Sequence, residues 1–149
     1  MVHQTKMKLS EYFDLSEFEY SNTAFIMGIY NKLPAELLPN VVRLHDNVLY
    51  SLRKATGCPV VISSGYRSEK LNESIGGVQN SQHSEGKAVD INVKGQSNLA
   101  VLNWIRKNCD FDQLIIEKVQ CSEWIHVSYN FGKNRKQVLH FDGKSYKSI

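Results

Sequence analysis

An acidic residue inside an otherwise apolar strand constrains this chain more than any other feature of its sequence. Residues 87–93 alternate in character, which predicts a strand whose core face carries Val89, Ile91 and Val93. Asp90 lies on the opposite face, where burying an unpaired carboxylate would cost several kcal/mol. The fold must therefore bring an arginine, a hydrogen-bond cluster or a metal ion to Asp90.

Two histidines are candidates to meet this carboxylate. His126 lies in the middle of a second alternating segment, residues 124–129, whose polar face also carries Trp124 and Ser128. His83 lies in a loop, residues 81–86, that leads into the strand of Asp90. Two histidines and one aspartate can form a zinc shell with an open fourth position. A histidine in a strand is also often a hydrogen-bonded structural residue, so these residues alone leave both interpretations open.

Three further charged residues could act beside such a centre. Glu123 precedes His126 by three residues and is a candidate general base. Arg67 follows a predicted buried strand, and its charge could polarise a carbonyl group or hold a carboxylate. Glu117, at the end of a predicted strand, is a second acidic candidate whose alternative role is a solvent-facing charge.

The order of predicted elements indicates an α+β fold with a largely antiparallel sheet flanked by helices. Helical periodicity runs over residues 39–56 and ends at Gly57, and a Ser16–Glu19 capping box predicts a short helix near the N-terminus. Further helices are predicted over residues 69–74 and 98–107, the latter with Leu99, Leu102 and Ile105 on its core face. Strands are predicted over residues 59–62, 87–93, 113–117, 123–129 and 137–141, the last joined to Tyr146 by an Asp142-Gly143 turn.

Composition narrows the class of protein. The 149 residues carry a net charge of +3, which gives no reason to expect nucleic acid as a partner, and no apolar run approaches the roughly 20 residues that span a membrane. We expect one domain over residues 1–149, with a core over about 9–129 and a basic tail over about 132–149. The chain is expected to be a monomer. No export signal is visible in the first residues, which predicts a cytoplasmic protein or one released by lysis.

Three segments resemble the zinc D-Ala-D-Ala carboxypeptidases and related peptidoglycan peptidases, over about residues 9–129. The first is Ser63-Ser64-Gly65-Tyr66-Arg67-Ser68. The second, residues 81–90, matches the family signature S-x-H-x-x-G-x-A-x-D at every fixed position. The third, Glu123-Trp124-Ile125-His126, is similar to the family's E-x-x-H element. The likeness is greatest to compact single-domain members found in phages and prophages.

This resemblance implies a function and a role for each candidate residue. Zn²⁺ would be held by His83, Asp90 and His126, in the fold shared with hedgehog signalling domains. Glu123, preferred over Glu117 because its offset from His126 matches the motif, would be the general base. The oxyanion would be stabilised by Arg67, and the substrate positioned by Ser81.

The substrate implied by the resemblance is a peptidoglycan stem peptide. The activity would be that of a D-Ala-D-Ala carboxypeptidase or of an endolysin-type endopeptidase. The alternative is a non-catalytic, zinc-containing binding or virion structural module of the same fold.

Overall fold

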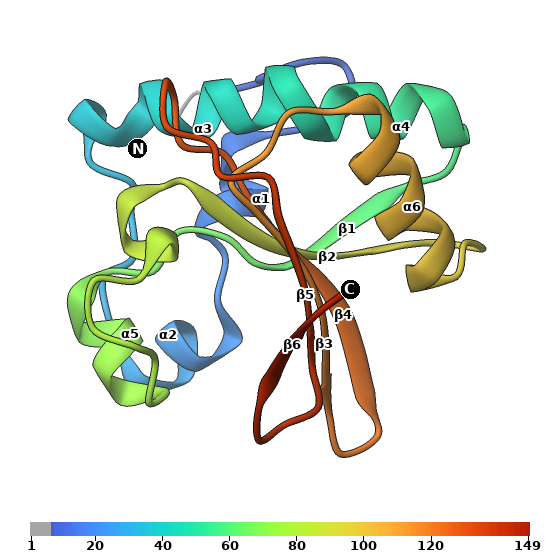
Figure 1. Cartoon of the computed structure of the whole chain (residues 1–149). Helices are drawn as coiled ribbons and strands as arrows, with labels where there is room; N and C mark the ends of the chain where they lie inside the picture. The colour runs from blue at the N-terminus through green and yellow to red at the C-terminus, as the bar shows by residue number, and fades with distance from the viewer. Residues whose placement is uncertain (1–6) are drawn as a thin grey trace.

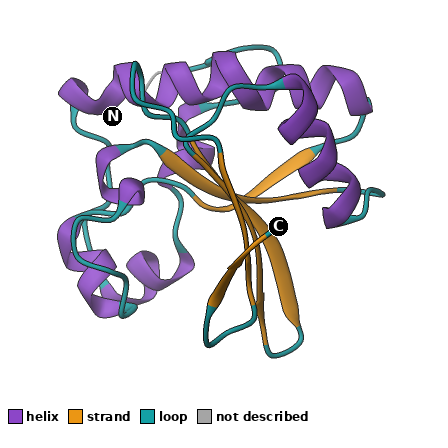
Figure 2. Cartoon of the chain, in the orientation of Figure 1, coloured by secondary structure: helices purple, strands orange, loops and turns teal. Residues whose placement is uncertain are grey.

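The strands of the described part of the chain form one sheet with helices against it. The computed structural model describes residues 7–149 (Figures 1 and 2). Its sheet has the strand order β1-β2-β4-β3-β5-β6, and neighbours are antiparallel except for the parallel pair β3 and β5. The strands are β1 (Val60–Ser64), β2 (Ala88–Val93), β3 (Gln113–Val119), β4 (Ser122–Ser128), β5 (Gln137–Phe141) and β6 (Tyr146–Ser148). This architecture confirms the α+β prediction.

The helices gather at the two sides of the sheet. They are α1 (Leu15–Glu19), α2 (Asn22–Met27), α3 (Leu38–Leu44), α4 (Tyr50–Thr56), α5 (Glu69–Ser74) and α6 (Asn98–Asn108). Short 3₁₀ helices cover Ala35–Leu37 and Gln82–Glu85, and a π-helical turn, His45–Leu49, joins α3 to α4. That run crosses the top of Figure 1 and corresponds to the helix predicted over residues 39–56. It ends at Gly57, whose φ of 64° suits a glycine cap.

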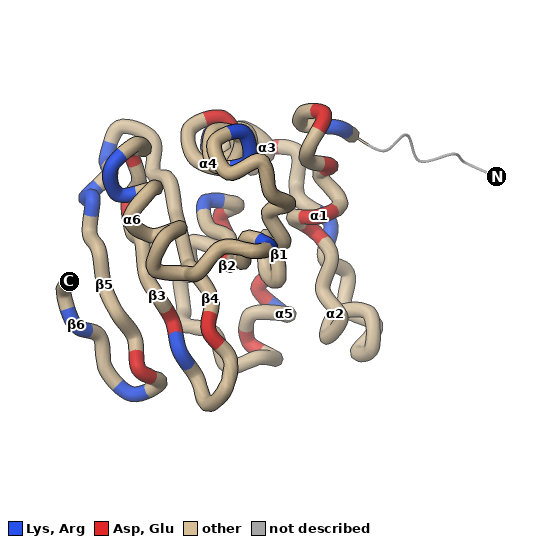
Figure 3. The backbone as a smooth tube through the Cα atoms, turned by 90° about the vertical axis from the view of Figure 1, so that its right-hand side faces the viewer, with Lys and Arg blue, Asp and Glu red and all other residues tan. Residues whose placement is uncertain are grey.

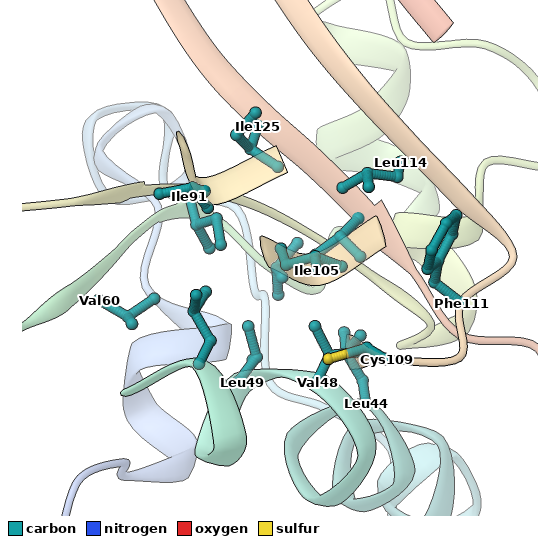
Figure 4. Close-up of a cluster of buried hydrophobic side chains, with 14 of the residues drawn as sticks. Leu44, Val48, Leu49, Val60, Ile91, Ile105, Cys109, Phe111, Leu114 and Ile125 are labelled. Atoms are coloured by element: carbon teal, nitrogen blue, oxygen red, sulfur yellow. The ribbon is translucent and has the colours of Figure 1, made fainter. Parts of the chain in front are cut away.

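The apolar face of the sheet packs under α3, α4 and α6. In Figure 4 side chains from helix and sheet point toward one another, among them Leu49, Ile105 and Ile125. Val89 and Ile91 are fully buried in the same cluster, as the alternation of residues 87–93 predicts. Burial of apolar surface on this side leaves the other face of the central strands free to carry polar side chains.

Strand register decides which side chains share that polar face. Asp90 of β2 pairs directly with His126 of β4, and Ile115 of β3 pairs with His126 from the other side. Glu117 pairs with Trp124, two residues before His126 in β4. Since side chains alternate along a strand and paired residues share a face, Glu117 and Asp90 lie on the same face as His126.

Some local predictions were wrong. In α6 the predicted core residue Leu99 is 59% exposed, and Val101 is buried with Leu102 and Ile105. The buried stripe thus consists of Val101, Leu102 and Ile105, the residues through which α6 packs into the core cluster.

The first helix also begins elsewhere than predicted. The capping carboxylate is Glu17, which accepts from the backbone amide of Asp14 at 2.7 Å, so the helix starts at Leu15 rather than after Ser16. Helix α2 was not predicted at all.

The basic C-terminal segment is part of the sheet. Strand β5 lies parallel to β3, and the predicted Asp142-Gly143 turn joins it to β6, with Asp142 Oδ1 accepting from the amides of Lys144 and Ser145 at 2.9 Å each. Lys and Arg residues lie at both ends of β5 and on β6 (Figure 3). Among residues 7–149, none of the helices has the length and apolar character that crossing a membrane requires.

Candidate metal centre

His83 is held by the turn that carries it. Ser81 caps the 3₁₀ helix by accepting from the amide of His83 at 3.2 Å, and Gly86 ends that helix with a φ of 71°. The Nδ1 atom of His83 lies 2.8 Å from the carbonyl oxygen of Gly65. A carbonyl oxygen only accepts, so Nδ1 carries the proton and Nε2 keeps a free lone pair. That lone pair faces Asp90, with Nε2 3.3 Å from Oδ1.

The same carboxylate oxygen meets the second histidine. His126 Nδ1 lies 3.0 Å from Asp90 Oδ1 across the β2–β4 ladder. One ligand atom from each of His83, Asp90 and His126 can be chosen so that all three lie within 4.8 Å of one another. Zinc binds nitrogen and carboxylate ligands at about 2.0–2.2 Å, so the contacts to Asp90 are short enough for a shared ion. The structure thus brings together the three ligands that the sequence predicts.

Charge in this cluster favours the protonation states that a metal needs. Burial opposes ionisation of Asp90, but His83 and His126 outweigh it and hold the pKa of Asp90 far below its usual range. Burial lowers the pKa of His83, which favours its neutral imidazole. A carboxylate together with a neutral histidine is the form in which such side chains bind metal, so the donor set fits a zinc ion.

Glu117 is the acidic residue that faces this cluster. Its Oε1 lies 3.9 Å from His126 Nδ1, and its side chain lines the same cavity. Burial raises the pKa of Glu117, and the negative charge of Asp90 adds to the rise. A carboxylate with a raised pKa that faces a metal centre has the properties of a general base.

Glu123 does not reach the cluster. It is exposed, and its Oε1 accepts from Nδ2 of Asn98 at 3.0 Å, at the start of α6. In a continuous strand an offset of three residues places two side chains on opposite faces, so Glu123 points away from His126. The geometry therefore does not fit the base role that the sequence motif predicted for Glu123, and it fits Glu117.

Arg67 reaches the cluster from the turn after β1. Its Nη2 lies 3.4 Å from Asp90 Oδ2, and its Nε donates to Ser64 Oγ at 3.0 Å. Nη1 contacts Oδ1 of Asn72 at 3.4 Å, on α5. Burial lowers the pKa of Arg67, while Asp90 and Glu117 oppose that effect. The guanidinium is thereby fixed between the metal ligands and α5.

These side chains line one cavity of about 670 Å³. Buried Ser81, predicted to position substrate, lines it too, close to His83. Among the lining residues that sequence reasoning missed are Arg135 and Tyr146, both from the segment interpreted as a basic tail. No short motif marks them, and only the pairing of β5 with β3 brings them to the cavity.

Comparison with known proteins agrees with this site. A search of curated proteins finds no match to the chain. A family model described as Peptidase M15 matches residues 11–128, a range that contains His83, Asp90, His126, Arg67 and Glu117. Members of that family are zinc enzymes, in keeping with the donor set of the cluster. The chain thus belongs to the peptidase M15 family of metallopeptidases.

Proposed function

We propose that this chain is a zinc peptidase that hydrolyses peptide bonds in peptidoglycan stem peptides. The observation that carries the proposal is the common cavity, in which Glu117 and Arg67 face the His83–Asp90–His126 cluster. A hydrolytic site needs a base and an anion-stabilising group around a single reacting carbon, and these residues supply both. The stem-peptide substrate is supported by the resemblance of residues 63–68, 81–90 and 123–126 to peptidoglycan peptidases.

The metal would be held by His83 Nε2, His126 Nδ1 and the Asp90 carboxylate. Zinc bound there would supply Lewis acidity, which polarises a carbonyl group and lowers the pKa of water toward about 7. The chain's contribution is to keep the ligands in place: the Gly65 carbonyl fixes the ring of His83, and the β2–β4 ladder fixes the other two.

Proton transfer is the role we propose for Glu117. Its carboxylate takes a proton from the attacking water and then gives that proton to the leaving amine. The raised pKa of Glu117 suits a group that must first accept a proton and then release it. This replaces the predicted role of Glu123, whose side chain lies on the other face of β4.

Arg67 and Ser81 complete the proposed site. As the peptide carbonyl is attacked, negative charge develops on its oxygen, and the Arg67 guanidinium in the same cavity stabilises it. Ser81 lies at the cavity wall next to His83 and helps to position the peptide. A non-catalytic binding module of this fold would have no need of Glu117 and Arg67 beside the metal ligands, so their presence favours an enzyme.

The test is direct hydrolysis of defined muropeptides by the purified, zinc-loaded chain, followed by mass spectrometry. We expect cleavage that a chelator abolishes and added zinc restores. Loss of a terminal D-Ala would indicate a carboxypeptidase, and two internal fragments would indicate an endopeptidase. Intact muropeptides after incubation with the zinc-loaded chain would refute the proposed activity.

A further inference from the structure

We propose that Arg135 is a substrate-recognition residue that binds a carboxylate of the peptide. The proposal rests on the proposed peptidase function and adds to it the chemical group that the cavity selects. Arg135 lies just before β5 and lines the cavity that contains Arg67 and Glu117.

Arg135 is fixed by a fully buried acidic residue. Its Nε donates to Oδ1 of Asp112 at 2.9 Å and its Nη2 donates to Oδ2 at 2.8 Å, a two-point contact along one edge of the guanidinium. The backbone amide of Arg135 also donates to Oδ1 at 2.9 Å. The hydrogen bonds from Arg135 lower the pKa of Asp112 to about 2, so this carboxylate stays charged and holds the arginine.

The same carboxylate ties Arg135 to the metal-binding turn. Gln82, the residue before His83, donates from Nε2 to Asp112 Oδ2 at 2.8 Å. Asp112 thus has Arg135 on one side and the turn of His83 on the other. The short contacts of Asp112 with Arg135 and Gln82 therefore fix the position of the guanidinium relative to the metal ligands.

The other edge of the guanidinium is free to bind a ligand. Nη1 and the second proton of Nη2 have no hydrogen-bond partner among residues 7–149, and the side chain is 56% exposed. The cavity's other guanidinium, that of Arg67, is engaged by Ser64, Asn72 and Asp90. These contacts engage all three nitrogens of the Arg67 guanidinium, whereas Nη1 of Arg135 has no partner among residues 7–149 and leaves a donor edge for an incoming carboxylate.

A planar guanidinium edge recognises a planar anion, and a peptide supplies this as a carboxylate. In a stem peptide two carboxylates qualify: the one at the C-terminus and the free α-carboxylate of a γ-linked glutamate. Tyr146, from β6, lines the same cavity and stacks on Phe141 with ring centroids 4.5 Å apart. The segment after residue 128 therefore supplies both a charged and an aromatic wall to the site.

The experiment measures binding separately from turnover. A synthetic stem pentapeptide is titrated calorimetrically into the zinc-loaded Glu117→Gln variant, in its unmodified form, as the C-terminal amide and as the glutamate α-amide. Because a hydrogen bond to a charged group contributes more to binding than one to a neutral group, amidating the recognised carboxylate should weaken binding by about tenfold or more. The amide that weakens binding identifies which carboxylate is recognised.

The same titrations on variants of Arg135 decide the assignment. In Arg135→Gln the ratio of acid to amide affinity should fall to about one. Arg135→Lys keeps the charge but lacks the planar guanidinium, so its ratio should lie between those of the parent protein and Arg135→Gln. Lys133→Gln removes one nearby positive charge outside the cavity and should keep the full ratio. If Arg135→Gln fails to fold because Asp112 loses its partner, Arg135→Lys and the parent protein still give the answer.

Three results would overturn the inference: equal affinity of the parent for acid and amides, an undiminished ratio in both Arg135 variants, or no binding of any of these peptides. These three results can be distinguished from a failure of the proposed peptidase function. If the wild-type chain with zinc cleaves no muropeptide while the acid preference depends on Arg135, the proposed activity falls and the recognition residue stands. If cleavage occurs and the preference for acid over amide is independent of Arg135, the recognition role of Arg135 falls and the proposed activity stands.

Discussion

Two glutamates on adjacent strands provide a matched test of the proposed base. Glu117→Gln should lower kcat by about 10²–10⁴-fold, because proton transfer by a positioned side chain contributes that much. Glu123→Gln should leave kcat close to wild type, since Glu123 is exposed and contacts Asn98 instead. Both changes remove one negative charge and keep side-chain size, so they differ in position alone. The measurement is steady-state hydrolysis of a muropeptide with zinc content determined in parallel. A large loss in Glu123→Gln with little in Glu117→Gln would reverse the assignment.

A second prediction concerns the buried carboxylate behind Arg135. The pKa of Asp112 is lowered to about 2 from 3.8, so its ionised form stabilises the fold above about pH 4, and that stabilisation is lost as pH falls toward 2. Asp112→Asn should therefore reduce the free energy of unfolding at pH 7 by about 2 kcal/mol. It should also flatten the decline in stability between pH 4 and pH 2. Urea denaturation across this range measures both effects.

The control for that variant is Asp110→Asn, which changes an exposed carboxylate two residues away. Its effect on the free energy of unfolding should stay within about 0.5 kcal/mol, as for most surface changes. Equal effects of the two substitutions at pH 7 would contradict the special role of the Asp112 contacts.

At this scale the sequence predicted the cluster of His83, Asp90 and His126 but not the position of Glu117 beside it. His83, Asp90 and His126 could be found because alternation places Asp90 and His126 on polar strand faces, and a buried carboxylate needs partners. Glu117 depends on the register of β3 against β4, where Val119 pairs with Ser122 and Glu117 therefore pairs with Trp124. This register is fixed by a two-residue hairpin turn at positions 120–121, and Gln120-Cys121 is not one of the dipeptides that mark such a turn in a sequence.

Among the secondary-structure elements, the junction between β1 and α5 links the fold to the site. Gly65 passes close to the backbone of Phe18, and a Cβ atom at Gly65 would clash with the Phe18 carbonyl oxygen. The neighbouring amide of Tyr66 donates to that same oxygen at 2.6 Å, so α1 holds this turn in place. The turn carries Arg67 and the carbonyl that orients His83.

Gly65→Ala should therefore affect both stability and the site. Crowding at a close contact of this kind costs about 1–3 kcal/mol, measurable as a shift in the urea midpoint. Zinc affinity should fall as well, since the hydrogen bond from His83 Nδ1 to Gly65 is disturbed. Val61→Ala, at an exposed position of β1, the strand that precedes this turn, is the control and should change zinc affinity little. Unchanged zinc affinity in a destabilised Gly65→Ala variant would show that the turn does not orient His83.

Elements with local signals were predicted well, and those that depend on distant contacts were not. Helices α5 and α6 begin at the predicted positions, where Ser68 and Ser97 cap them, and Gly57 ends α4 as predicted. The hairpin of β5 and β6 was also predicted, because Asp142-Gly143 is a local turn signal. The parallel pairing of β5 with β3 has no such signal, since it joins segments that are separated by β4 and a long loop.

For the molecule as a whole, the order of the sheet explains how one face comes to carry the candidate metal centre. The strands of Asp90, His126 and Glu117 are adjacent at its centre, with β1 on one side and β5–β6 on the other. Helices α3, α4 and α6 bury the opposite face, so the stability of the fold depends mainly on a core that contains no site residue. The α+β class followed from the order of the predicted elements, in which helices come first and strands broken by helices follow, whereas the strand order emerged only from the structure.

This separation of core and site predicts how the metal affects stability. Without a metal, Asp90 is already paired with His126 and Arg67, so the chain should fold when zinc is removed. Zinc binds the folded state alone, and at about 100 times its Kd it should stabilise the fold by about 2.7 kcal/mol. For a chain of this length that raises Tm by about 5–10 °C, which differential scanning calorimetry with zinc and with chelator measures.

His126→Ala should abolish the zinc-dependent shift in Tm, whereas His140→Ala, in β5 and outside the cluster, should retain it. A full shift in His126→Ala would mean that zinc binds somewhere other than the cluster.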